Sequence, residues 1–183
     1  MTAATGDATE PEEIRWAGQF ITARTRGKWE YVSRARGIRA AVILAIDADD
    51  HVLLVEQYRV PLGKRCLELP AGLVGDNAGA EGEDAAQAAN RELEEETGYR
   101  AERIEVVGEF YSSPGMVSES FTLVRAHGLS KVGPGGGTAS EDITVHRVAL
   151  PQLPEFVETA RGRGLGIDVR LLMLLAPGII GRA

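Results

Sequence analysis

The sequence has very little cysteine and no long apolar run, and each shortage excludes a class of protein. Cys66 is the only cysteine, which excludes an internal disulfide and a multi-cysteine metal site and is typical of a reducing compartment. No segment approaches the roughly eighteen apolar residues that a membrane span requires. Residues 1–13 lack the apolar core of a signal peptide and predict a disordered tail. We therefore expect a soluble, cytoplasmic protein with no membrane partner.

Basic residues are also in short supply. The chain carries 20 lysine and arginine residues against 27 aspartate and glutamate residues, a formal net charge of -7. This balance argues against a nucleic-acid partner, because such partners need a basic surface. A phosphate-bearing ligand would need cations supplied locally. With 183 residues, of which 44% are hydrophobic, one well-filled domain is expected.

The order of apolar runs and turn residues predicts an α+β fold, a mixed sheet between helices in an α/β/α arrangement. Residues 14–36 predict an N-terminal hairpin, and residues 37–183 predict the main domain. A glycine-rich acidic loop precedes the central helix, which Gly98 should end. The predicted elements are hairpin strands near 16–24 and 28–34, a second hairpin from 38–46 and 51–59, a short strand in "CLELPAGLVG", a helix at 84–97, strands at 102–113, 119–129 and 143–150, and C-terminal helices in "LPEFVETARGRG" and "DVRLLMLLAPGII".

Four glutamates crowd the end of the predicted central helix, although like charges one turn apart repel. Glu92, Glu95 and Glu96 share one face of the helix, whereas Glu94 points elsewhere. Three converging carboxylates can relieve their repulsion by taking up protons or by binding a hard divalent cation, and oxygen ligands suit Mg²⁺ or Mn²⁺. The alternative is a solvated acidic face on which Arg91 pairs with Glu95 at i, i+4.

The surrounding residues resemble a known family. Glu83, followed by seven residues and "RELEEETGY", is similar to the Nudix hydrolase box, and every position from Glu83 onward matches. The box glycine does not match, since Asn77 stands six residues before Glu83. We interpret Gly72, ten residues before Glu83, as that glycine, with a five-residue insertion in the loop. The resemblance covers most of the chain and implies a mixed sheet between helices.

The resemblance also implies an activity and roles for the acidic residues. Members of the family hydrolyse a nucleoside diphosphate linked to another group, with divalent metal ions. By the box, Glu92 and Glu96 would be the main metal ligands and Glu95 a third or outer ligand. The carbonyl of Ala71 would be a further ligand, and Arg91 would hold a glutamate in position. Chemically, cations would offset the charge of the diphosphate and activate water in this acidic protein.

Features outside the box resemble the ADP-ribose and ADP-sugar pyrophosphatase branch. They are "VEQYRVPLG", "LELPAGL", "SSPGMVSES", and Pro114 sixteen residues after Gly98. The resemblance implies cleavage of ADP-ribose to AMP and ribose 5-phosphate with Mg²⁺. Another nucleoside diphosphate sugar, such as GDP-mannose, remains an alternative substrate. A non-catalytic nucleotide-sugar sensor is a second alternative, although a binding module would not need the complete acidic cluster.

Four residues outside the box are candidates for substrate binding by the same resemblance. Arg59 would contact the diphosphate and Glu68 the polar edge of the substrate. Trp29 would stack on the adenine, with Arg34 nearby, because the N-terminal hairpin helps to form that site in this branch, often across a homodimer. The alternatives are a surface ion pair for Arg59, a solvent-facing strand residue for Glu68, and a core or interface tryptophan for Trp29.

Two loop glutamates are candidates for the general base. Glu119 lies in "PGMVSES" and Glu141 in "TASEDITVH", and both contexts resemble loops that supply this residue in the family. Loop acids are also commonly just solvated. The sequence does not separate the two candidates.

Overall fold

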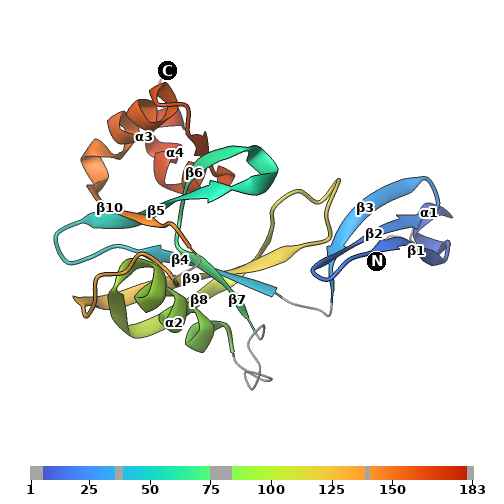
Figure 1. Ribbon diagram of the computed structural model, residues 1–183, viewed down its shortest axis with the longest axis horizontal. Helices are drawn as coiled ribbons and strands as arrows, with labels where there is room; N and C mark the ends of the chain where they lie inside the picture. The colour runs from blue at the N-terminus through green and yellow to red at the C-terminus, as the bar shows by residue number, and fades with distance from the viewer. Residues whose placement is uncertain (1–5, 36–38, 75–83, 139–140, 181–183) are drawn as a thin grey trace.

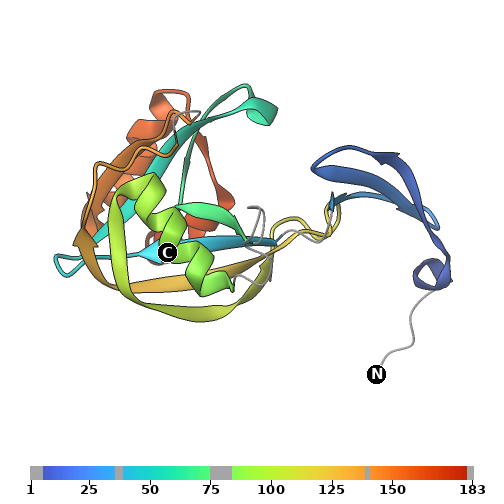
Figure 2. The same cartoon turned by 60° about the horizontal axis from the view of Figure 1, so that its bottom comes forward.

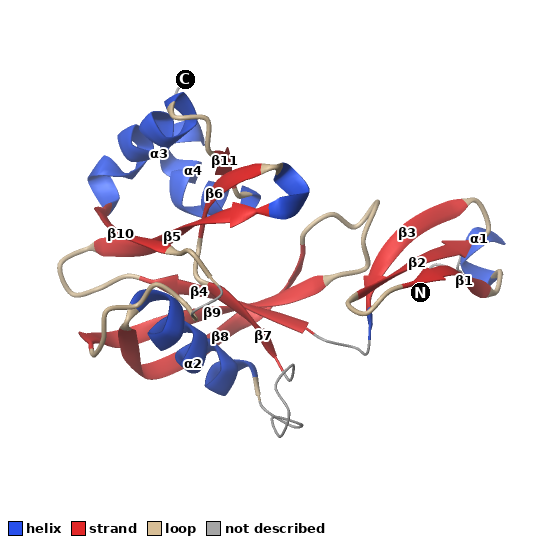
Figure 3. Cartoon of the chain, viewed as in Figure 1, coloured by secondary structure: helices blue, strands red, loops and turns tan. Residues whose placement is uncertain are grey.

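The structure is a computed structural model that describes residues 6–35, 39–74, 84–138 and 141–180 (Figure 1). The acidic loop expected between Gly72 and Glu83 falls largely outside these residues, as does Glu83 itself. Within the described part, strands form three sheets and helices lie at both sides of the main body (Figure 3). No helix in this part is long and apolar enough to cross a membrane.

Two four-stranded sheets form the body of the molecule. The first has the order β10-β5-β6-β11 and the second the order β7-β4-β9-β8. Pairing is antiparallel except for β4 with β9 and β11 with β6. The strands are β4 (Arg39–Ala45), β5 (His51–Arg59), β6 (Lys64–Glu68), β7 (Ala71–Val74), β8 (Tyr99–Tyr111), β9 (Ser120–Lys131), β10 (Thr144–Ala149) and β11 (Gly166–Ile167).

Helices cover the two sheets from opposite sides (Figures 1 and 2). The α2 helix (Ala85–Thr97) packs Ala89 and Leu93 against Ile43 of β4 and Val124 of β9. The α3 helix (Leu153–Gly162) and the α4 helix (Leu172–Ile180) cover the other core, around Leu54. Short 3-10 turns lie at η2 (Val60–Leu62), η3 (Leu150–Gln152) and η4 (Val169–Leu171). This layering confirms the α+β prediction, with two mixed sheets in place of one.

The N-terminal segment forms a separate three-stranded sheet to one side of the body (Figures 1 and 2). Its strands are β1 (Glu12–Ala17), β2 (Ile21–Arg26) and β3 (Trp29–Arg34). The sequence predicted two strands here, and the first, at 16–24, was wrong because the chain turns at Gly18 and starts a second strand. Ordered structure also begins earlier than the predicted tail allowed. A helical turn, α1 (Gly6–Thr9), precedes β1. In β1, the carboxylate of Glu12 accepts hydrogen bonds from the guanidinium of Arg24 and the hydroxyl of Tyr31.

The second predicted hairpin was also wrong. The predicted strands match β4 and β5, but they share a single bridge between Ile46 and Val52 and then enter different sheets. Both strands are buried on both faces over most of their length, so each serves as an inner strand of its own sheet. The predicted strand in "CLELPAGLVG" likewise divides at Pro70, with β6 in one sheet and β7 in the other.

Candidate active site

The α2 helix begins and ends where local rules place it. The Asp84 side chain accepts hydrogen bonds from the backbone N–H groups of Ala86 and Gln87, at 2.9 and 2.8 Å. Gly98 ends the helix with a φ of 71°, a left-handed conformation that glycine adopts at little cost. The predicted helix at 84–97 is therefore confirmed. Its last two turns lie against a cavity of about 590 Å³ between the two sheets.

Glu96 is the most buried acid of the cluster, with 5% of its surface exposed. Its Oε2 accepts a hydrogen bond of 3.0 Å from the backbone N–H of Ala71, at the start of β7. Burial raises the pKa of Glu96, the Ala71 hydrogen bond lowers it and the nearby charges of Glu92 and Glu141 raise it, so that it lies at about 8. A carboxyl with this pKa gives up its proton readily once a cation lies beside it.

Glu92 lies beside the backbone of β7. A Cβ atom built on Gly72 would lie 1.9 Å from Glu92 Cγ, so glycine is required for this close approach. Arg91 donates from Nη1 to Glu92 Oε1 at 2.6 Å and from Nη2 to the carbonyl of Leu73 at 3.4 Å. The same Nη1 lies 3.6 Å from Glu95 Oε2. Arg91 therefore connects the acidic face of α2 to β7.

The four glutamates do not all reach the cavity. Glu92 and Glu96 line it, whereas Glu95 is exposed and does not. Glu94 points away and forms an ion pair with Arg100, as its position on the helix predicted. The structure thus brings together three of the four predicted metal ligands, Glu92, Glu96 and Ala71, which all line the cavity.

The donor chemistry of this wall suits a hard cation. Glu92, Glu96 and the Ala71 carbonyl offer oxygen only, which Mg²⁺ and Mn²⁺ prefer. Among the described residues, no three acidic, histidine or cysteine side chains are arranged to hold a metal ion as they stand. The positions explain this, because Glu92 turns toward Arg91 and Glu95 lies at the exposed edge. The oxygen donors fit a divalent ion, with two carboxylates rather than three inside the cavity.

Both candidate general bases line the same cavity. Glu119 forms an ion pair with Arg34 of β3, and Ser118 next to it donates its backbone N–H to the Val32 carbonyl at 2.9 Å. Glu141 accepts hydrogen bonds from the N–H and hydroxyl of Thr138, at 2.8 and 3.0 Å. Because both acids line the cavity, the structure does not distinguish between them as the general base.

The loop that carries Glu141 is attached to the end of α2. The backbone N–H of Gly136 donates to the carbonyl of Glu96 at 2.8 Å, and that of Gly137 donates to the carbonyl of Glu95 at 3.0 Å. These bonds satisfy carbonyls that a helix end leaves without partners. The acidic helix and the Glu141 loop are therefore joined by their backbones.

The opposite wall contains Arg59 and Glu68, two of the residues predicted to bind substrate. Arg59 donates from Nε and Nη2 to the two carboxylate oxygens of Glu68, at 2.7 and 2.6 Å. Glu68 is 2% exposed, so the alternative of a solvent-facing strand residue is wrong. Arg59 keeps 40% of its side chain exposed at the cavity. Arg34 lines the cavity from the side of the N-terminal sheet.

Two functional candidates on this wall were not predicted from the sequence. Asp168 and Arg170, in the segment between β11 and α4, line the cavity beside Arg59 and Glu68. Arg170 forms a two-point ion pair with Asp168, at 2.7 and 2.5 Å. The sequence offers only a weak signal for them, an aspartate two residues before an arginine at the start of a helical pattern.

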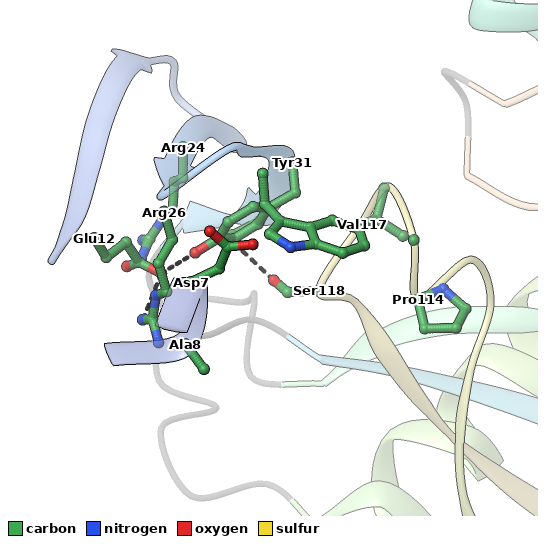
Figure 4. Close-up of a pocket in the computed structure, with 12 residues that line it drawn as sticks. Asp7, Ala8, Glu12, Arg24, Arg26, Tyr31, Pro114, Val117 and Ser118 are labelled. Atoms are coloured by element: carbon green, nitrogen blue, oxygen red, sulfur yellow. Dashed lines mark hydrogen bonds and ion pairs between the residues drawn. The ribbon is translucent and has the colours of Figure 1, made fainter. Parts of the chain in front are cut away.

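Trp29 lies in a different cavity, of about 530 Å³, between the N-terminal sheet and the loop from Pro114 to Ser118 (Figure 4). Tyr31, Arg24 and Arg26 line the same space, and 51% of Trp29 is exposed. The predicted neighbours Trp29 and Arg34 therefore face separate cavities within one chain.

Comparisons with known proteins agree with the site. Residues 36–159 match the NUDIX domain. The chain is 36% identical to the methanol dehydrogenase activator of Bacillus methanolicus over 67% of its own length and 64% of that protein. It is 37% identical to the ADP-ribose pyrophosphatase of Bacillus subtilis over 50% of its own length and 46% of that enzyme. These matches span less than two thirds of either relative.

The solved structure of an ADP compounds hydrolase has the same fold. It superimposes with a TM-score of 0.66, covers 94% of each chain, and is 23% identical in sequence. The domain match includes β4, β7 and the whole of α2, and so spans the acidic wall of the cavity. This chain belongs to the NUDIX domain family.

Proposed function

We propose that this protein is a Mg²⁺-dependent diphosphatase that hydrolyses ADP-ribose, or a related ADP-sugar, to AMP and a sugar phosphate. The observation that carries the proposal is the acidic cavity wall formed by Glu92 and Glu96 on α2, facing the arginine wall at Arg59. The relative named ADP-ribose pyrophosphatase supports the choice of substrate. The first alternative is another nucleoside diphosphate sugar such as GDP-mannose.

The charge of the cavity explains why a cation is part of the proposal. Among the described residues that line it, six are acidic and three are arginine. Each arginine is already paired with one of those acids: Arg34 with Glu119, Arg59 with Glu68 and Arg170 with Asp168. The lining therefore carries excess negative charge and would repel a diphosphate without added cations.

Glu92, Glu96 and the carbonyl of Ala71 would hold the cation. When bound, Mg²⁺ (or Mn²⁺) supplies neutralisation of the phosphate oxygens and acidity to bound water. Arg91 keeps Glu92 against β7, and the Ala71 N–H orients Glu96. Glu95, at the exposed edge, would serve as an outer ligand at most.

The proposed reaction adds water across the P–O–P bridge. The water oxygen bonds to one phosphorus, the bridging oxygen leaves with the other phosphate, and one proton passes to a base. Glu119 or Glu141 would accept that proton, because both line the cavity opposite or beside α2. Arg59 would contact the diphosphate, with Glu68 fixing its orientation.

A homodimer is also part of the proposal. The N-terminal sheet leaves Trp16, Phe20 and Trp29 more than half exposed, which is unusual for large aromatic residues on a monomer. A second copy packed on this sheet would cover them and could place Trp29 over the adenine of its neighbour's substrate. Light scattering at several protein concentrations would measure the oligomeric state, and a monomer throughout would contradict this part. A cytoplasmic location completes the proposal, consistent with the single buried Cys66.

The test of function is a panel of nucleotide sugars with Mg²⁺. We expect release of AMP from ADP-ribose to exceed release of GMP from GDP-mannose, and chelation of the metal to abolish both. Glu96→Gln should lower turnover by at least about a hundredfold, since it removes one anionic ligand from the metal wall. Tight binding of ADP-ribose without any product would support the sensor alternative instead.

A further inference from the structure

The C-terminal segment reaches the cavity through strand pairing. β11 pairs in parallel with β6, with Gly166 beside Cys66 and Ile167 beside Leu67. The next residue, Asp168, donates its backbone N–H to the Leu67 carbonyl at 3.0 Å. This register places Asp168 next to Glu68 at the end of β6. The η4 turn then starts, and Asp168 Oδ1 accepts the N–H of Arg170 at 2.7 Å.

Four side chains at this point form one network. Arg59 pairs with Glu68, and Arg170 pairs with Asp168, each through its Nε and Nη2 atoms. Glu68 Oε2 joins the two pairs, because it lies 2.6 Å from Arg59 Nη2 and 3.6 Å from Arg170 Nη2. The Arg170 guanidinium also lies over the ring of Phe121, 5.7 Å from its centroid. The two guanidinium groups are therefore neighbours in fixed positions.

Each of the two arginines has N–H donors that the network does not use. Within the described part of the chain, Nη1 of Arg59 and Nη1 of Arg170 make no hydrogen bond. Both side chains line the cavity, with 40% and 19% of their surface exposed. A guanidinium has five N–H donors in a planar fork, so a carboxylate on one edge leaves the other edge for a second anion.

The network is poorly explained by stability alone. Buried ion pairs contribute little compared with apolar residues of the same volume, because desolvation offsets their attraction. Burial alone would raise the pKa of Asp168, but the hydrogen bonds from Arg170 outweigh it and lower that pKa, so Asp168 stays charged at neutral pH. What the network does provide is two arginine side chains whose conformations are set before a ligand arrives.

The geometry points to Arg170 as a second phosphate-binding residue, which together with Arg59 forms a two-arginine clamp across Glu68. Asp168 acts as the positioning residue of this clamp. The ligand class is a phosphate ester or diphosphate, because two oxygens of one phosphate can accept the paired N–H donors of a planar guanidinium. The inference adds a ligand contact from the C-terminal segment, and it rests on the proposed function only for the identity of the substrate.

The kinetic test compares Arg170→Gln with Arg170→Lys. With ADP-ribose and Mg²⁺, we expect Arg170→Gln to raise KM about tenfold to a hundredfold, as loss of a charge-assisted contact does, and to change kcat less than about threefold. Arg170→Lys should recover part of the loss, because it restores the charge without the fork. Arg100→Gln is the matched control, since Arg100 pairs with Glu94 away from the cavity. An unchanged KM in Arg170→Gln would overturn the inference.

A binding test separates this inference from the proposed function. Calorimetric titration of the protein in Mg²⁺ with AMP and with ribose 5-phosphate involves no turnover, because both are products of the proposed reaction. We expect Arg170→Gln to weaken at least one of the two about tenfold, and the affected product identifies which phosphate the clamp holds. If the variant binds AMP and ribose 5-phosphate as tightly as the wild type does, the clamp is overturned. Wild-type protein that binds these ligands but hydrolyses no ADP-sugar would instead contradict the proposed function.

A folding control is needed because Arg170→Gln leaves Asp168 without its partner. The double variant Asp168→Asn with Arg170→Gln removes the stranded charge and should unfold at a temperature close to that of the wild type. The clamp requires the same weakened phosphate binding in this variant. Restored binding in the double variant would show that Arg170 acts only through Asp168, and would overturn the inference.

Discussion

Replacement of Glu96 by glutamine should stabilise the metal-free protein while it abolishes catalysis. The pKa of Glu96 is raised to about 8 from 4.5, so the folded chain holds this proton more tightly than the unfolded chain does. Below pH 4.5 both states are protonated and the carboxyl has no effect on stability. As pH rises toward 8, the unfolded state releases its proton first, and folding becomes less favourable. Glutamine removes this penalty and can still accept the Ala71 hydrogen bond.

The magnitude follows from the size of the shift. One pKa unit corresponds to about 1.4 kcal/mol, so the variant should be more stable by about 3 kcal/mol at pH 7 and by somewhat more at pH 8.5. Near pH 5 the difference should be under about 1 kcal/mol. Urea unfolding with a chelator present, at these three pH values, measures the free energy of unfolding directly.

The control is Glu95→Gln, one residue earlier on the same helix but exposed. Its stability should follow that of the wild type at every pH. Added Mg²⁺ should stabilise the wild type and leave Glu96→Gln nearly unchanged, since a ligand stabilises only the state that binds it. A stability difference between Glu96→Gln and wild type that does not change with pH would refute the reasoning, because it would not come from the titration of Glu96.

Two further substitutions probe the close approach at Gly72 and the buried ion pairs of Glu56. Gly72→Ala would place a methyl group 1.9 Å from Glu92 Cγ, so we expect it to displace Glu92. The variant should lower kcat at least about tenfold at saturating Mg²⁺. A near-normal kcat would show instead that β7 can move away from α2. Burial would raise the pKa of Glu56, but hydrogen bonds from His146 and Arg65 outweigh it and lower that pKa. Glu56→Gln should therefore cost about 2 kcal/mol at pH 7, a loss that fades as pH falls below about 4. Urea titrations at both pH values check this, and an equal loss at pH 3.5 would contradict it.

The sequence was most informative where structure depends on neighbouring residues. Asp84 and Gly98 fix the ends of α2 through contacts within a few residues, and helical periodicity alone separates Glu94 from Glu92 and Glu96. These rules act along one helix, so they need no knowledge of the rest of the fold. The acidic wall of the cavity could therefore be predicted before the sheets were known.

The sequence was least informative where position depends on pairing between distant segments. The strands β4 and β5 follow one another and each has an apolar centre, so a hairpin was the simplest interpretation, yet they belong to different sheets. Glu95 shares a helical face with Glu92, but the edge of the cavity falls between them. Asp168 and Arg170 reach the cavity only because β11 pairs with β6, a contact that no local pattern encodes.

The backbone bonds from Gly136 and Gly137 to the last turn of α2 have a mechanical consequence. When this part of the molecule fluctuates, the acidic helix and the Glu141 loop must shift as one body, so their spacing survives breathing motions. The arginine wall belongs to the other sheet, and the Glu141 loop is joined to that sheet too, because Asp142 accepts hydrogen bonds from Arg65 of β6 and Thr144 pairs with Glu56 of β5. Any movement of one sheet relative to the other would therefore displace Glu141, because its loop is bonded both to α2 and to β6.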